Sequence, residues 1–177
     1  VYIPSVSYLL PVGHLLPTLL TKIQAPAIRM FLPKCGYNQN MPRAVVFGPP
    51  EYAGIGFRHF TLEQGAGQID YFLKFWRTGC EVGSLLRIAL SWSQYMAGVS
   101  WPILENIVAP LPHLETKWLP SMRNFLCSID SALEIDTPFM YPIQREHDFH
   151  LMDRVLDSGR FKPQDICMLN YCRLFLG

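Results

Sequence analysis

The sequence has few charged residues and no long uninterrupted apolar run. Only 16% of its 177 residues are charged, whereas 50% are hydrophobic. A chain of this composition can bury a substantial core, which argues against disorder over most of its length. No stretch reaches the roughly 18 apolar residues that a membrane-spanning helix requires, and prolines interrupt the apolar residues 1–20. The composition therefore predicts one sizeable domain or two small ones, with neither a signal peptide nor a membrane partner.

Paired cysteine motifs are also missing. The five cysteines form no C-x-x-C pair, and their number is odd. A disulfide framework or a zinc finger needs paired spacing, so reduced thiols in an intracellular protein, nuclear or cytoplasmic, are the simpler interpretation. The one local histidine cluster is His147 and His150, whose spacing could place both rings on one helix face. No second pair of ligands accompanies it, so no metal site is predicted.

Signatures of catalysis are nearly absent. The sequence contains no G-x-S-x-G, no P-loop and no H-E-x-x-H motif. The stretch "GAGQID" at residues 65–70 begins like a dinucleotide-binding loop, but it lacks the third glycine and a preceding strand. Asp148 and Asp153 lie five residues apart, off a shared helical face, and no Asp-Asp dipeptide occurs. Because no nucleophile and base can be named together, a stand-alone enzyme has the least support, and no cofactor is predicted.

Positive charge is concentrated in the first third of the chain. Residues 1–58 hold one acidic residue, Glu51, against five basic ones: Lys22, Arg29, Lys34, Arg43 and Arg58. That part carries +4 and the remainder −3, although the whole chain carries only +1. A basic segment suits contact with a phosphate backbone. An uneven distribution of charges over a solvated surface explains the pattern equally well.

The periodicity predicts a mainly α fold, an irregular helical bundle with a loop-rich N-terminal third and at most one or two short strands. Residues 14–32 read as a helix that Pro17 and Pro26 either kink or divide in two. Residues 33–63 are rich in proline, glycine and asparagine, and "RAVVFG" at 43–48 favours a short strand within them.

The remainder of the chain has clear helical stripes. Apolar residues recur at helical spacing over 69–76, 85–99, 118–129 and 149–156, and Gly98 is placed to end the second of these helices. The helix over 85–99 has apolar residues on most faces, so we expect it to be largely buried, with Trp76 and Trp92 in the core. Pro163 is placed at the first turn of a last helix.

The stretch "GPPEYAGIGFRHFT", residues 48–61, combines closely spaced glycines with aromatic and basic residues. Gly54 and Gly56 lack a Cβ, so they can adopt positive φ or let another backbone approach closely. We interpret them mainly as a structural turn, with Ile55 pointing into the core between them. The alternative is a direct nucleic-acid contact made by Arg58.

The order of these motifs resembles the region that follows the catalytic domain in reverse transcriptases of non-LTR-type retroelements, particularly those abundant in diatoms and related protists. In such proteins a "GGLGL"-like signature follows a basic, proline-containing stretch and precedes a helix. Here the signature reads "AGIGF", with Ala53 in place of the first glycine. The resemblance extends over residues 20–177 and includes "SWSQYMAGVS", "TKWLPSMRNFL", "REHDFHLMD" and "LNYCRLFL".

The resemblance implies a piece of an RNA-directed DNA polymerase without the catalytic aspartates. The palm, with its Mg²⁺, would lie upstream of Val1, since the chain begins without methionine and reads as a fragment of a longer protein. Residues 1–63 would form a basic thumb-like segment and residues 64–177 a helical connection region. The implied partners are the backbone of an RNA/DNA duplex, held by the five basic residues, and the palm of the same polyprotein. The alternative is a helical protein-interaction module with no nucleic-acid role.

Overall fold

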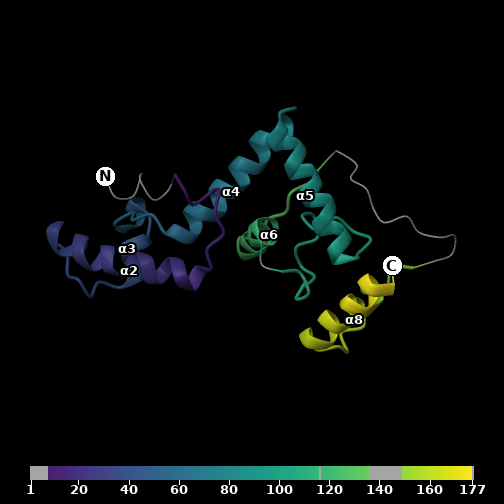
Figure 1. Ribbon diagram of the computed structural model, residues 1–177. Coiled ribbons are helices and arrows are strands. Elements are labelled where there is room, and N and C mark those ends of the chain that lie inside the picture. Colours follow the sequence, from purple (N-terminus) through teal and green to yellow (C-terminus); the bar gives the residue numbers. More distant parts are fainter. Residues whose placement is uncertain (1–7, 116, 136–148, 177) are drawn as a thin grey trace. The chain divides into compact units, whose positions relative to one another are not determined.

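The computed structural model describes residues 8–115, 117–135 and 149–176 (Figure 1). Helices are the only regular elements in these ranges, which contain no strand, so the prediction of a mainly α fold is confirmed. The chain divides into two compact units, Val1–Tyr71 and Phe72–Gly177. The division falls inside helix α4 (Phe60–Arg77), eight residues beyond the boundary expected at 63/64.

The first unit is built on α2 (Pro17–Lys34), which begins with a proline at its first turn. Its buried residues recur every fourth position and form one stripe: Leu20, Gln24, Ile28 and Leu32. The helix continues through Pro26 and is not divided in two. Pro26 removes the N–H that would bond to the carbonyl of Lys22, but both residues are exposed, so water can satisfy that carbonyl.

The predicted strand at 43–48 is wrong, because "RAVVF" forms the short helix α3 (Arg43–Phe47). Pro42 supplies the carbonyl that accepts the first hydrogen bonds, from the N–H groups of Val45 and Val46 at 3.0 and 3.1 Å. Val46 is fully buried against Ile28 and Leu32 of α2. β-Branched residues favour strands only where a neighbouring strand can pair with them, and the described part of the chain offers none. A 3₁₀ turn, η1 (Pro50–Tyr52), follows α3.

Glutamines on α4 hold the segment that precedes α2. The Gln64 side chain accepts from the N–H of Leu15 and donates to its carbonyl, both at 3.0 Å. One turn later, Gln68 donates to the carbonyl of Gly13 at 2.8 Å. Phe60, at the start of α4, is buried in a cluster with Leu10 and Leu20. Buried amides thus replace the backbone pairing that this irregular segment lacks.

The second unit contains α5 (Glu81–Ala97), α6 (Trp118–Ser128), α7 (Leu151–Asp157) and α8 (Pro163–Leu176). Helix α5 packs on α6, and α7 packs on α8. Gly98 ends α5 in a left-handed conformation, with φ of 66°, and Pro163 is the first residue of α8. Both of these end signals were read correctly from the sequence.

The predicted burial of α5 is wrong for much of the helix. Its buried positions are Gly83, Leu90, Gln94 and Ala97, whereas the Trp92 side chain lies on the outer face and is 58% exposed. Trp76 on α4 is only half-buried. A Cβ on Gly83 would collide with the backbone carbonyls of Phe75 and Thr78, which shows how closely this face of α5 approaches the preceding turn.

Buried polar side chains organise the long loop between α5 and α6. Arg123 of α6 donates to three loop carbonyls, those of Ile103, Asn106 and Ala109, at 2.6–2.8 Å. Gln94 of α5 binds both ends of its amide to the same loop, accepting from the N–H of Ile103 at 3.1 Å. Burial lowers the pKa of the Arg123 guanidinium, which nevertheless stays charged at any physiological pH.

Candidate nucleic-acid interface

All five basic residues singled out in the sequence lie in the first unit, and all five are exposed. Helix α2 carries three of them, Lys22, Arg29 and Lys34. Arg43 begins α3, and Arg58 lies in the segment that leads into α4. Lys22 and Arg29 are seven residues apart, so they share one helical face, on the far side of α2 from its buried stripe. Lys34 sits in the last turn of α2, where a cation also complements the helix dipole.

Only one of these cations has an ionic partner among the described residues. The Arg58 guanidinium lies 3.5 Å from the Glu63 carboxylate, with side chains 65% and 27% exposed. An exposed pair of this kind contributes little to stability, but it offsets part of the charge of Arg58. Lys22, Arg29 and Lys34 make no ion pair within the described ranges, and neither does Arg43. These four side chains therefore present uncompensated positive charge to solvent.

The glycine stretch forms a tight corner against the C-terminal end of α3. The N–H groups of Ile55, Gly56 and Phe57 donate to the carbonyls of Val45, Gly48 and Val46, at 2.8–3.0 Å. These bonds satisfy carbonyls that the short helix leaves without partners. A Cβ on Gly54 would overlap the carbonyl group of Gly48, and Gly56 has a φ of 70°.

The corner also packs its side chains into the core. Ile55 and Phe57 contact the buried cluster of Ile28, Leu32 and Val46. Ala53, just before the two glycines, adopts a φ of 61°. A non-glycine residue in this left-handed region is conformationally strained. Backbone packing therefore explains the sequence motif. At the surface, the motif places Arg58 directly after the turn.

Gln24 fixes Arg58 relative to α2. Its amide nitrogen donates to the Arg58 carbonyl at 2.6 Å, and its amide oxygen accepts from the N–H of Phe60 at 3.2 Å. The side chain is 3% exposed, so both ends of a buried amide are satisfied at once. The start of α4 is therefore tied to the middle of α2, between the exposed positions Lys22 and Arg29.

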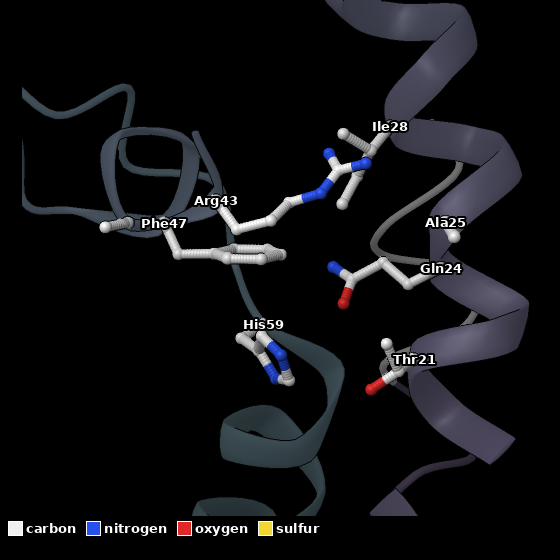
Figure 2. Close-up of a pocket in the computed structure, with 8 residues that line it drawn as sticks. Thr21, Gln24, Ala25, Ile28, Arg43, Phe47 and His59 are labelled. Carbon is white, nitrogen blue, oxygen red and sulfur yellow. The ribbon is translucent and has the colours of Figure 1, made fainter. Parts of the chain in front are cut away.

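A pocket of about 300 Å³ opens between α2 and α3. Figure 2 shows Thr21, Gln24, Ala25 and Ile28 along α2, with Arg43, Phe47 and His59 facing them across the space. Ala44 completes the lining. The Phe47 and His59 rings meet edge to face, with centroids 4.6 Å apart. Arg43 was expected from the charge distribution, but the pocket was not, because Thr21, Arg43 and His59 come together only when the first unit folds.

Of the residues weighed as metal ligands or catalytic acids, Asp153 makes a structural contact and His150 precedes α7. His147 and Asp148 lie outside the described residues. The Asp153 carboxylate accepts from the N–H of Ser100 at 3.1 and 3.2 Å, which ties α7 to the loop after α5. Within the described ranges, no three histidine, cysteine, aspartate or glutamate residues gather as they would around a metal ion. The cysteines described there are all free thiols.

No helix in the described part of the chain combines the length and the apolar character needed to cross a bilayer. Comparison with protein-family models, with curated proteins and with solved structures finds no match to this chain.

Proposed function

We propose that this chain is the non-catalytic thumb and connection region of a retroelement reverse transcriptase, and that its first unit contacts the primer–template backbone without base specificity. The observation that supports this most directly is the group of four exposed cations, Lys22, Arg29, Lys34 and Arg43, which have no ionic partner among the described residues. Lysine and arginine side chains that are free of carboxylates can displace counterions condensed on a nucleic acid.

The proposal assigns the chemistry of polymerisation to the palm of the same polyprotein. Mg²⁺ would be held there by carboxylates, and the present chain would supply affinity and position only. The basic side chains suit this positioning role because phosphate contacts orient a duplex without reading its sequence. Helix α2 presents Lys22 and Arg29 on one face, about 10 Å apart along the axis, given a rise of roughly 1.5 Å per residue. That spacing lets both reach phosphates of one duplex.

A salt titration tests the proposal. Binding of an RNA–DNA hybrid should weaken steeply with salt, with a log–log slope of about −0.9 per neutralised phosphate on B-form DNA and a similar trend on a hybrid. The double variant Lys22→Gln/Arg29→Gln should lower both the affinity and the slope, equally for hybrids of unrelated sequence.

The matched control is Lys162→Gln/Arg160→Gln in the second unit. It also removes one lysine and one arginine, both exposed, so it changes net charge by the same amount. Fluorescence titrations at several salt concentrations compare the two variants. Equal slopes would mean that the basic surface is only solvated, and the proposal would fail.

The second candidate function, a helical protein-interaction module, is favoured by the outer face of α5. Leu85, Ile88 and Trp92 are each more than half exposed and lie at helical spacing, which makes an apolar stripe. Such stripes mark protein contacts more often than isolated apolar residues do. The salt titration separates the two candidates, since a pure interaction module would show no slope that depends on Lys22 and Arg29.

A further inference from the structure

The pocket between α2 and α3 holds a cation that no described residue neutralises. Arg43 is exposed and makes no ion pair within the described ranges. Its side chain extends from α3 across the Phe47 ring toward Ile28 of α2 (Figure 2). An arginine placed at the mouth of a pocket can bind an anion through two parallel N–H groups. The pocket therefore favours a ligand with a phosphate or carboxylate group.

His59 adds a neutral donor to the same pocket. Its Nδ1 accepts from the N–H of Thr61 at 3.2 Å, so the proton of the neutral imidazole resides on Nε2. Burial lowers the pKa of His59, and the ring is therefore uncharged at neutral pH. In Figure 2 the Phe47 ring lies between His59 and the Arg43 guanidinium, so His59 offers a ligand a second, uncharged donor apart from the cation.

The remaining lining is largely apolar. Ala25, Ile28 and Phe47 supply a wall against which a flat ring can pack. The volume, about 300 Å³, lies at the small end of the range of roughly 300–1,000 Å³ for small-molecule sites. The space suits a ligand with one flat ring and an anionic group, such as a pyrimidine nucleotide, and is small for a larger ligand.

The polar groups that could read a base are mostly occupied. Both ends of the Gln24 amide are bound to backbone, and the Thr21 hydroxyl donates to the Pro17 carbonyl at 2.9 Å. Apart from the Arg43 guanidinium, which the anion would occupy, the lining offers a ligand only the Thr21 lone pairs and the His59 Nε2–H. With no free amide, and with Arg43 bound to the anion, the lining can form no bidentate contact that distinguishes bases.

We propose that this pocket binds one unpaired nucleotide, with its phosphate at Arg43 and its base against Phe47, Ile28 and Ala25. The recognised chemistry is a phosphate and a flat base joined through a sugar, which a free mononucleotide and an unpaired residue of a strand both offer. That the nucleotide belongs to a strand rests on the proposed backbone contact. That the pocket binds a nucleotide does not rest on it, because neither Lys22 nor Arg29 lines the pocket.

Calorimetric titration of the whole chain tests the ligand chemistry, with uridine 5′-monophosphate, uridine and inorganic phosphate as probes. The monophosphate should bind at least tenfold more tightly than either of its parts. Arg43→Gln should weaken it about tenfold, as expected for the loss of one charge-assisted contact. Arg29→Gln, which removes an equal charge from the exposed face of α2, should leave it unchanged. Absence of monophosphate binding, or equal loss in the two variants, would overturn the proposal.

A space-filling pair of variants tests the location. Ala25→Leu fills the pocket, whereas Ala27→Leu adds the same atoms to α2 at a position that does not line it. Only Ala25→Leu should abolish monophosphate binding, with circular dichroism and the melting temperature confirming that both variants fold. Equal binding by the two variants would place the ligand elsewhere and sink the assignment. Tighter binding of phenyl phosphate than of the monophosphate would identify the pocket as a phosphotyrosine site instead and would also overturn it.

A third measurement, the binding of an eight-residue oligothymidylate, distinguishes a nucleotide within a strand from a free nucleotide. If Ala25→Leu lowers its affinity several-fold, the pocket accepts a nucleotide within a strand. If the oligonucleotide is unaffected while the monophosphate is lost, the pocket accepts free nucleotides. Failure of the backbone contact would appear separately, as an unchanged salt slope for the RNA–DNA hybrid in Lys22→Gln/Arg29→Gln.

Discussion

The first unit leaves its lysine and arginine side chains in solvent, whereas the second unit uses two of its arginines as internal hydrogen-bond donors. Arg123 donates to three loop carbonyls and is 4% exposed. Arg173 of α8 donates to the carbonyls of Tyr95 and Met96 at the end of α5. Lys22 and Arg29 make no ion pair with the described residues. Residues of the same charge therefore serve folding in one unit and remain available for ligands in the other.

This difference cannot be read from a count of charges. Guanidinium groups that bind backbone carbonyls are committed, because releasing them would leave buried acceptors without donors. The charge balance along the sequence placed the basic surface in the first third, but it could not identify Arg123 and Arg173 as structural. The comparison becomes testable when residues of each kind are replaced.

The largest effect is expected at Arg123. Replacement by Met keeps much of the side-chain volume but leaves three loop carbonyls, one buried and two partly buried, without their donor, and a buried acceptor left unpaired costs about 1–3 kcal/mol. The free energy of unfolding of Arg123→Met should therefore fall by about 3 kcal/mol or more. The four tryptophans lie in the second unit, so urea unfolding followed by tryptophan fluorescence reports on it. The matched replacement Arg43→Met, at an exposed site of the first unit, is followed by far-UV circular dichroism because that unit holds no tryptophan, and it should change stability by about 0.5 kcal/mol or less. Similar losses in both would contradict the distinction.

A smaller loss is expected from the glycine corner of the first unit. A Cβ at Gly54 would meet the Gly48 carbonyl group, which is backbone and cannot rotate away. Gly54→Ala should destabilise the first unit by about 1–3 kcal/mol, as overpacking does elsewhere. Gly13→Ala is the control, because its Cβ would make only an ordinary contact, 3.6 Å from the Leu9 carbonyl oxygen. Melting followed by far-UV circular dichroism compares them, and an unperturbed Gly54→Ala would refute the close-packed corner.

The second unit should also respond to pH through His113. Its Nε2 lies 2.9 Å from the Ala97 carbonyl, and its buried Nδ1 has no partner within the described residues. Burial, with the nearby charge of Arg173, lowers the pKa of His113 below its ordinary value of about 6.5. The unfolded chain then binds more protons than the folded one as pH falls through about 6.5, so stability decreases in that direction.

The variant His113→Gln isolates this contribution. Glutamine can still donate to the Ala97 carbonyl, but it does not titrate. Tryptophan-monitored urea midpoints at pH 8, 6 and 5 should fall less steeply for the variant than for the parent. Parallel pH profiles would assign the acid sensitivity of the second unit to groups other than His113.

Local signals in the sequence predicted where α5 ends and where α8 begins, but not that α4 begins at Phe60, nor which helix faces are buried. Gly98 and Pro163 act through their own backbone geometry, so their roles were visible in isolation. The strand predicted over 43–48 failed because Val45 and Val46 are compatible with either structure until a partner is known. The pocket was invisible for the same reason, since Thr21 and His59 become neighbours only after α2 and α3 pack.

Helix α5 provides the smallest expected effect and the sharpest test of this point. It has two apolar stripes, and periodicity alone cannot show which of them is buried. The structure buries Leu90 on the inner stripe and leaves Trp92 on the outer one, 58% exposed. The outer tryptophan still contacts Tyr95, with ring centroids 5.8 Å apart, so its removal is not neutral. Trp92→Ala should cost less than about 1 kcal/mol, against roughly 2–5 kcal/mol for Leu90→Ala.

Circular dichroism is the appropriate measurement, because Trp92→Ala removes a fluorophore. A tryptophan has more apolar surface than a leucine, so residue size alone would predict the reverse order, about 3–5 kcal/mol for the tryptophan. If Trp92→Ala lowers stability more than Leu90→Ala does, the stripe that contains Trp92 is the buried one. The apolar outer face would then disappear, and with it the observation that favours a protein-interaction module. If Leu90→Ala is more damaging, Trp92 remains a surface residue that a protein partner can cover.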